Sequence, residues 1–232
     1  TKDQFHASSA TMRDIQLVAI SHLHPDHSAE LPAILWPAGG EMSISGPIAG
    51  DMFPSISDFL VGMFGEDGLF AALGPRVDFD VITVDTASGE ASDVWSDGDV
   101  VVRGIGVPHG FVPAVGYRVD VGDVSIAFSS DQNGSDPAWA EFAQGVDVFV
   151  VHLATSETAV PQQGTNTVPV TLHARPSVWG QMAADAEAGS VLVSHISTSS
   201  PETLEESLGF LRRNYGGPVI VGEDMLCVEV GS

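Results

Sequence analysis

The sequence predicts an α/β protein in which helices cover β-sheets. Short runs rich in valine and isoleucine recur along the chain, and their length suits buried strands. Helix-like stretches lie between some of these runs, above all in the last third of the chain. Histidine or aspartate follows several of the runs directly, which indicates a site built at one edge of a sheet.

The expected strands are mostly apolar and follow one another from the first quarter of the chain to its end. They cover residues 16–20, 81–84, 100–107, 116–121, 124–129, 146–151, 190–194 and 219–221. The segment 100–130 is typical of consecutive hairpins, whereas strands and helices alternate in the last third.

Three segments in the second half predict helices. The segment 136–144 starts with Asp136 as N-cap and Pro137 at the first helical position. The segment 175–188 is rich in alanine, methionine and glutamine, and 200–214 begins with Ser200 as the expected N-cap. In the first half, 57–73 predicts a helix that glycines interrupt.

The charge of the chain is strongly negative, with 31 acidic residues against 8 lysines and arginines and a formal net charge of −23. Such a surface repels phosphate backbones, so we expect nucleic acid to be disfavoured as a partner. The single cysteine, Cys227, excludes an internal disulfide and a cysteine-based metal cluster. No apolar stretch approaches the ~20 residues that span a bilayer, and no signal peptide is visible.

The first expected strand runs into the sequence Ser-His-Leu-His-Pro-Asp-His. His22 and His24 alternate, so on an extended segment their side chains face the same side. Pro25 then forces a turn, after which Asp26 and His27 can point elsewhere. Four potential ligands in six positions are hard to explain by packing, because buried imidazole and carboxylate groups need partners. We therefore expect this loop to serve two adjacent metal ions.

The remaining candidate ligands each follow an expected strand. His109, Asp131, His152 and His195 come at or directly after the apolar runs of four different strands. One such residue is weak evidence, since aspartates at strand ends commonly form turns. Their joint occurrence predicts a single site at one edge of the sheet.

The His22–His27 stretch resembles the metallo-β-lactamase superfamily, whose hallmark is His-x-His-x-Asp-His. Further segments, in the same order, resemble the ribonuclease Z branch of that superfamily. They are Leu-Pro-Ala-Ile-Leu at 31–35, Gly-Pro at 46–47, Gly-Tyr-Arg at 116–118, Ser-Ser-Asp at 129–131, His-Leu-Ala-Thr at 152–155, and the histidines His173 and His195. The resemblance covers residues 15–199.

This resemblance implies a four-layered αββα sandwich, the metallo-β-lactamase fold, as one hydrolase domain over residues 1–232. It also implies two divalent metal ions, usually zinc, with Mn2+ or Fe as alternatives. By motif position, His22, His24 and His109 would hold one ion, Asp26, His27 and His195 would hold the other, and Asp131 would bridge them. A hydroxide between the ions would attack an ester-like bond, and Asp26 and His173 are the candidate catalytic residues.

The chain departs from the branch in its histidine–glutamate motif, where Leu153 stands at the position of the glutamate. That glutamate is thought to orient the neighbouring histidine during proton transfer. We expect His173 to donate a proton to the leaving group without that partner. The alternative is that His173 is a structural loop residue that caps the following helix. We expect His152 to support the pocket rather than to bind metal.

The segment 31–75 differs from the basic arm with which ribonuclease Z holds tRNA, because it contains no lysine or arginine. Its methionines and phenylalanines favour an apolar lid over the pocket, with plain core packing of a short helix pair as the alternative. The branch's upstream strands have no counterpart before Thr1, so we expect the first sheet to be incomplete and its core exposed.

The leading hypothesis is a dinuclear zinc hydrolase of a small ester-like substrate: a phosphodiester, sulfate ester, lactone or β-lactam. The alternatives are a tRNA 3′-end endonuclease and a metal-binding protein of this fold that does not catalyse. We expect a small-molecule substrate and no membrane partner, with a homodimer left open. The compartment is not predicted, since cytoplasmic and secreted mature forms both fit.

Overall fold

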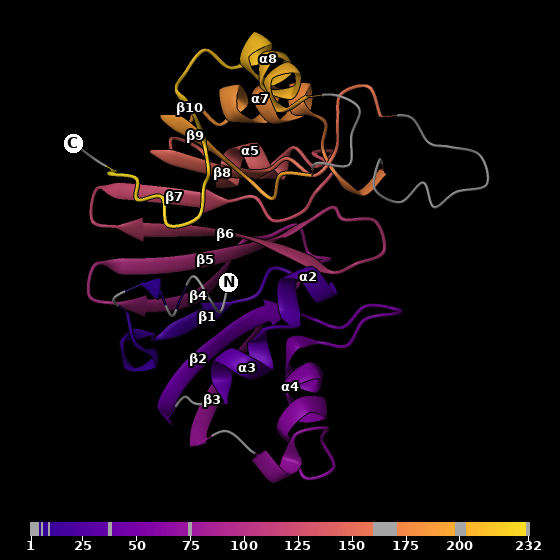
Figure 1. Ribbon diagram of the computed structural model, residues 1–232, viewed down its shortest axis with the longest axis vertical. Coiled ribbons are helices and arrows are strands. Elements are labelled where there is room, and N and C mark those ends of the chain that lie inside the picture. Colours follow the sequence, from indigo (N-terminus) through magenta and orange to yellow (C-terminus); the bar gives the residue numbers. More distant parts are fainter. Residues whose placement is uncertain are drawn as a thin grey trace.

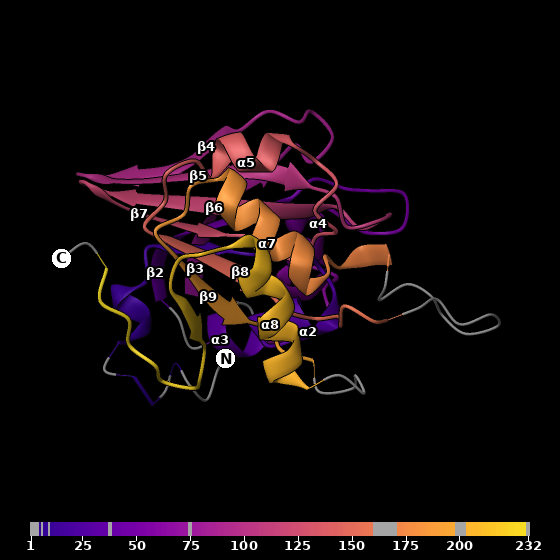
Figure 2. The same ribbon diagram turned by 90° about the horizontal axis from the view of Figure 1, so that it is seen from above.

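The computed structural model describes residues 5, 7–8, 10–36, 39–73, 76–159, 171–197 and 203–230. Two β-sheets lie face to face, and helices cover the outer face of each sheet (Figure 1, Figure 2). One apolar cluster lies between the sheets, and one lies beneath the helices on each outer face. The layers therefore follow the order α, β, β, α, which confirms the expected sandwich.

The first sheet consists of three parallel strands, β1 (Leu17–Ala19), β2 (Gly39–Pro47) and β3 (Arg76–Val84), in that order. Helices α3 (Leu31–Leu35) and α4 (Ile56–Phe64) cover its outer face. Their buried side chains pack on Met42 and Ile44 of β2; they are Leu31, Leu35, Ile56 and Leu60. Shorter elements are η1 (Met12–Asp14), α2 (Pro25–Ser28) and η2 (Ala71–Leu73).

The first sheet is short on the β1 side. Among the described residues, β1 pairs with β2 and no strand pairs with its other edge. A cavity of about 510 Å3 lies along that edge, between Leu17 of β1 and the side chains of Val119 and Phe128 on the second sheet. The cavity leaves apolar side chains of both sheets open along this edge.

The second sheet has seven strands in the order β10-β9-β8-β7-β6-β5-β4. Their bounds are β4 (Ser92–Asp97), β5 (Val100–Val107), β6 (Ala114–Val121), β7 (Val124–Phe128), β8 (Val148–His152), β9 (Ser190–Ser194) and β10 (Val219–Val221). Strands β4 to β7 are antiparallel hairpins, and β7 to β10 are parallel. The expected change from hairpins to alternating helix and strand is thus confirmed.

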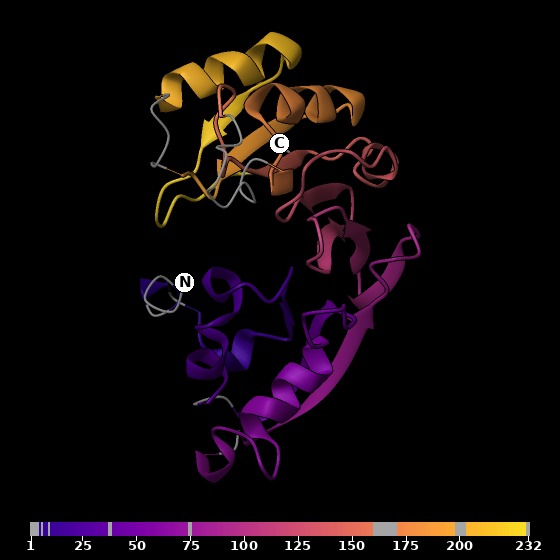
Figure 3. The same ribbon diagram turned by 90° about the vertical axis from the view of Figure 1, so that its right-hand side faces the viewer.

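Three helices cover the outer face of the second sheet: α5 (Ala138–Phe142), α7 (Pro176–Asp185) and α8 (Leu204–Asn214). Figure 3 shows them on the side of the molecule opposite the first sheet. Trp139 of α5 and Trp179 of α7 are almost fully buried against this sheet, in contact with Phe149 of β8. The large rings account for much of the buried apolar area that stabilises this half of the sandwich.

The contact between α7 and α8 depends on Gly180. A Cβ atom there would clash with the backbone carbonyl oxygen of Leu211, which cannot move without shifting α8. We expect Gly180→Ala to lower the free energy of unfolding by about 1–3 kcal/mol, measured by urea denaturation. Gly209→Ala on α8 is the matched control, because nothing lies within 4 Å of its added methyl group. The control is expected to be neutral or stabilising by up to about 1 kcal/mol, and equal losses in both variants would contradict this packing.

Two of the expected helix starts need correction. Helix α8 begins at Leu204, and its N-cap is Thr203, whose side chain accepts a hydrogen bond from the Glu206 N–H. The capping box of Thr203 with Glu206 fixes this start. Ser200, the N-cap expected from the sequence, lies outside the described residues. In α5 the N-cap is Pro137 and not the expected Asp136, although the Asp136 carboxylate accepts a hydrogen bond from the N–H of Ala138.

The segment 31–75 contributes both to the core and to the rim of the molecule. It holds α3, β2, α4 and η2, while residues 37–38 and 74–75 lie outside the description. Within it, 57–73 forms the end of α4, a turn and η2, so the interrupted helix is confirmed in outline. The expected lid stays a prediction for the part of the segment that lies near the site.

Candidate metal centre

The loop after β1 brings its histidines together. Nε2 of His22 lies 3.0 Å from Nδ1 of His24, and His22 is fully buried. Pro25 occupies the first turn of α2, where its fixed φ suits a helix start. This places Asp26 and His27 on the first turn of α2, so the expected turn at Pro25 is observed as a short helix.

The second sheet supplies the other candidate ligands from one edge. Strands β5, β7, β8 and β9 run in the same direction, so their carboxyl ends lie at the same edge of the sheet. His109, Asp131 and His195 follow β5, β7 and β9, and His152 is the last residue of β8. The structure thus brings together residues that are more than 80 positions apart in the chain.

Four groups of three side chains at this edge could each hold a metal ion, with candidate ligand atoms within 4.8 Å of one another. Two of them are the expected groups: His22, His24 and His109, and Asp26, His27 and His195. The other two share Asp131, which lies with His22 and His27 in one and with His109 and His173 in the other. Nδ1 of His24 lies 3.4 Å from Nε2 of His109. In the group of Asp26, His27 and His195, the Nε2 atoms of the two histidines are 3.1 Å apart. The Oδ2 atom of Asp26 lies 3.4 Å from Nε2 of His195.

Asp131 lies between the two groups and is only 2% exposed. Its Oδ2 atom is 4.0 Å or less from ring nitrogens of five histidines: His27 at 3.3 Å, His195 at 3.7 Å, His22 and His173 at 3.8 Å, and His109 at 4.0 Å. The other oxygen, Oδ1, is 2.7 Å from Nδ1 of His152. One carboxylate therefore faces both groups, while His152 fixes its orientation from behind.

The protonation of this cluster suits metal binding. Burial lowers the pKa of His22 to about 2 and that of His109 to about 4, so both imidazoles are neutral at pH 7. Burial alone would raise the pKa of Asp131, but hydrogen bonds from His152 and His27 outweigh it and keep the carboxylate ionised. Neutral imidazoles and an ionised carboxylate are the forms that bind divalent metals.

His173 closes the site from the loop before α7. Its Nδ1 atom is buried and has no hydrogen-bond partner in the described part of the structure, although it lies 3.8 Å from Oδ2 of Asp131. A buried nitrogen without a partner is costly, so it indicates a ligand or substrate group at this point. The Leu153 side chain is 4% exposed and packs in the core beneath α7, where it offers His173 no polar contact.

Supporting contacts that sequence reasoning missed surround the cluster. Ser21 Oγ lies 3.1 Å from Nδ1 of His22, and the carbonyl oxygen of Leu172 lies 3.2 Å from Nδ1 of His109. Each contact fixes the ring so that its other nitrogen faces the site. The Trp179 indole N–H donates to the backbone oxygen of His152 at 2.9 Å. No sequence signal marks these partners, because they depend on the three-dimensional approach of separate loops.

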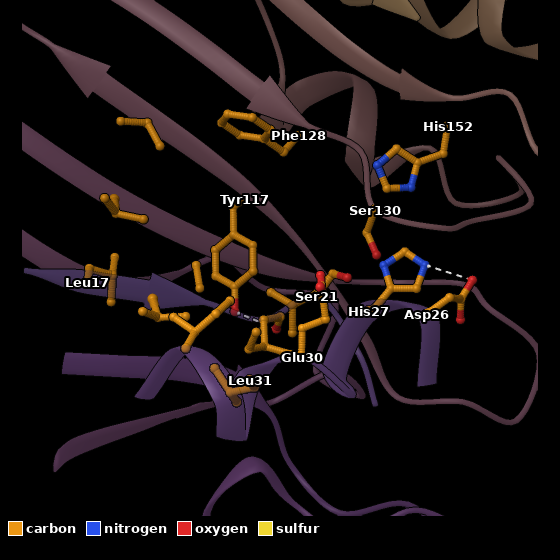
Figure 4. Close-up of a pocket in the computed structure, with 17 residues that line it drawn as sticks. Leu17, Ser21, Asp26, His27, Glu30, Leu31, Tyr117, Phe128, Ser130 and His152 are labelled. Atoms are coloured by element: carbon orange, nitrogen blue, oxygen red, sulfur yellow. Dashed lines mark hydrogen bonds and ion pairs between the residues drawn. The ribbon is translucent and has the colours of Figure 1, made fainter. Parts of the chain in front are cut away.

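The large cavity along β1 ends at this centre. Figure 4 shows Asp26, His27, Ser130 and His152 at one end and Tyr117 and Phe128 further along. Tyr117 donates its hydroxyl hydrogen bond to the Ile20 carbonyl oxygen at 3.1 Å, which ties the two sheets together beside the histidine loop.

Comparison with known proteins agrees with this architecture. No family model matches the chain. Ribonuclease Z from Synechococcus sp. (strain WH7803) is 27% identical over 233 residues, which is 92% of this chain and 65% of that protein. The human tRNase Z short form superposes with a TM-score of 0.73 at 16% identity, covering 100% of this chain and 85% of that chain. Zn2+-bound PqqB from Methylobacterium extorquens gives 0.65 at 14% identity, with 98% and 78% covered.

These findings identify the fold: the chain has the metallo-β-lactamase fold. By sequence the chain is similar to a ribonuclease Z, in agreement with the expected resemblance to the ribonuclease Z-like branch. The chain spans 65% of the length of that relative. None of the described helices is long and apolar enough to cross a membrane.

Removal of bound metal is expected to destabilise the protein. A ligand that binds the native state at about 100 times its Kd adds roughly 2.7 kcal/mol, which corresponds to a melting-temperature shift of roughly 5–10 °C for a chain of this size. Dialysis against chelator at constant ionic strength should lower the melting temperature by this amount, and Zn2+ should restore it. An unchanged melting temperature after metal analysis has proven the loss would count against a structural contribution.

Proposed function

We propose that this chain is a dinuclear metal-dependent hydrolase of an ester-like bond. The observation that supports it best is Asp131, whose buried Oδ2 atom lies within 4.0 Å of five histidine nitrogens from both candidate groups. A carboxylate in that position suits two cations, because it can serve both at once. Without cations, such a density of imidazoles around one carboxylate has no evident structural purpose.

In this proposal His22, His24 and His109 hold one ion, and Asp26, His27 and His195 hold the other. Two divalent ions would supply Lewis acidity, which lowers the pKa of water and stabilises negative charge on the substrate. The histidine and carboxylate donors suit zinc, and the zinc-bound PqqB relative supports that choice. Mn2+ and Fe bind the same donor types and are the alternatives.

Side chains of the protein would donate the proton to the leaving group, contact the substrate and orient Asp131. We assign His173 as the proton donor to the leaving group, because its buried Nδ1 atom faces the site without a partner. The second candidate catalytic residue is Asp26, whose carboxylate is exposed at the mouth of the site and can contact substrate as well as His195. His152 holds Asp131 in place and also lines the cavity along β1.

Two substrate classes compete for this site. The first class is a small ester-like molecule. The net charge of −23 favours it over a nucleic acid, because an acidic surface repels phosphate backbones. Three of the arginines also bind acceptors within the fold, so their charge is not directed at a substrate. Arg103 and Arg118 pair with Asp120, and Arg175 donates to the carbonyl oxygens of Glu157 and Ala159. The ribonuclease Z relatives favour the second class, a tRNA precursor cleaved at its 3′ end.

A hydrolysis screen separates these proposals. The metal-loaded protein is tested against chromogenic phosphodiester, sulfate ester, lactone and β-lactam substrates and against an unprocessed tRNA, with metal content measured on the same sample. Turnover of a small substrate supports the leading proposal. Cleavage of tRNA with affinity that falls steeply with salt supports the endonuclease. No turnover by protein that contains two metal equivalents would contradict both and leave a non-catalytic metal-binding role.

A further inference from the structure

Phe53 and Phe111 lie beside the metal centre on loops from different sheets, and the exposed Met52 precedes Phe53 in the chain. Met52 and Phe53 lie in the loop between β2 and α4, and Phe111 lies in the loop between β5 and β6. Met52 is 74% exposed and Phe111 is 53% exposed. We refer to Met52, Phe53 and Phe111 as the aromatic platform. Exposed apolar groups that gather at the rim of a site indicate a binding surface.

The loops that carry the platform are held together before any ligand binds. The rings of Phe53 and Phe111 lie 6.1 Å apart at an interplanar angle of 33°. The N–H of Gly50 donates to the carbonyl oxygen of Phe53 at 2.9 Å, which closes the first loop into a turn. A Cβ atom at Gly50 would clash with Pro113, so glycine permits the two loops to pack against each other. The platform is therefore preorganised for a ligand.

The platform is continuous with the metal centre. The ring of Phe53 meets the edge of the His24 ring, with centroids 5.6 Å apart. Phe111 follows His109 by two residues, and the N–H of Val112 donates back to the His109 carbonyl oxygen at 3.2 Å. A cavity of about 330 Å3 is lined by both Phe111 and His109. A substrate group that packs on the platform therefore lies close to the candidate metal ligands His24 and His109.

Acidic side chains near the platform disfavour an anionic group on it. Asp51 precedes Met52 on an exposed loop, and Asp136 lines the same cavity as Phe111. The segment 31–75 contains no lysine or arginine to oppose these carboxylates. Phosphate groups would therefore be repelled, whereas an uncharged ring gains contact with the two phenylalanines.

We infer that the aromatic platform binds an uncharged aromatic or apolar group of the substrate and so determines its specificity. This inference rests on the proposed metal-dependent hydrolase, and it names the part of the substrate next to the bond that is cleaved. The platform does not take part in the chemistry; it selects substrates by the group attached to the reacting centre.

The test compares two metal-binding probes, benzohydroxamate and acetohydroxamate, on the metal-loaded protein. Both carry the same chelating group, and they differ in a phenyl ring against a methyl group. We expect benzohydroxamate to bind roughly 3- to 10-fold more tightly, as befits aromatic contact energies. The Met52→Ser/Phe111→Ser double variant should bring this ratio close to one, with metal content unchanged.

Leu69→Ser is the matched control, because Leu69 is also 74% exposed but follows the C-terminal end of α4, whereas Met52 and Phe53 precede its N-terminal end. The control should keep the ratio of the unmodified protein. The inference is overturned if the unmodified protein shows no preference, if it fails to bind benzohydroxamate, or if the double variant keeps the ratio. Binding of these probes needs metal but no turnover. Absence of hydrolysis would therefore contradict the proposed function, whereas the ratio of the two hydroxamate affinities would still test the role of the platform.

Discussion

Replacing Asp131 by alanine is expected to lower metal occupancy in both halves of the centre and to reduce hydrolysis by roughly 1,000-fold or more. The reason is its position, because one buried oxygen faces His27 and His195 on one side and His22 and His109 on the other. Loss of a ligand that serves one ion alone would spare the other. Elemental analysis of the purified variant, after equilibration with Zn2+, measures the outcome directly.

Two controls make this prediction specific. Asp123→Ala removes an exposed carboxylate from the turn between β6 and β7 and should keep both metal equivalents. Asp131→Asn keeps the shape of the side chain, so it separates loss of charge from loss of packing. Circular dichroism confirms that each variant is folded. Two full metal equivalents in folded Asp131→Ala would refute the bridging role.

Replacing His173 by alanine is expected to reduce turnover by roughly 100- to 10,000-fold while metal content stays constant. His173 faces Asp131 at 3.8 Å but belongs to neither group of ligands assigned to an ion. As a proton donor it should matter most for leaving groups that depart with difficulty. The measurement is kcat for two substrates with the same acyl or phosphoryl part, one releasing 4-nitrophenolate and the other an alkoxide.

The expected pattern is a large loss for the alkoxide and a small loss for 4-nitrophenolate, which needs no proton to depart. An equal loss for both leaving groups would assign His173 a different role, such as substrate binding. A loss of metal in the variant would make it a ligand instead. His173→Gln serves as a second variant, because it preserves polarity and size without a titratable group.

The sequence predicted the sandwich largely from its second sheet. Each strand from β5 to β10 contains a short run rich in valine or isoleucine, which marks it in the sequence. Strand β2 carries small residues such as Ser43 and Ser45, with Met42 and Ile44 as its buried apolar side chains, so residue pattern alone did not mark it. Its Gly-Pro end was noticed only through the family resemblance. Strand β4 was missed as well, since Val94 is its one buried residue and the strand lies at the edge of the sheet.

The candidate centre was predictable because its residues follow strands. Once β5, β7, β8 and β9 share one direction, their carboxyl ends meet, and the histidine loop after β1 needs to face only that edge. The sequence could not show how Asp131 divides its oxygens between His152 and the two groups. Nor could it show that Phe53 and Phe111 approach each other, because the order of strands in two separate sheets determines that contact.

The central claim is that one chain holds two metal ions on either side of Asp131. Anomalous X-ray diffraction at the zinc absorption edge, on crystals of the zinc-saturated protein, tests it most directly. We predict two peaks per chain, one among His22, His24 and His109 and one among Asp26, His27 and His195, with Asp131 between them. A single peak, or peaks remote from these residues, would contradict the account.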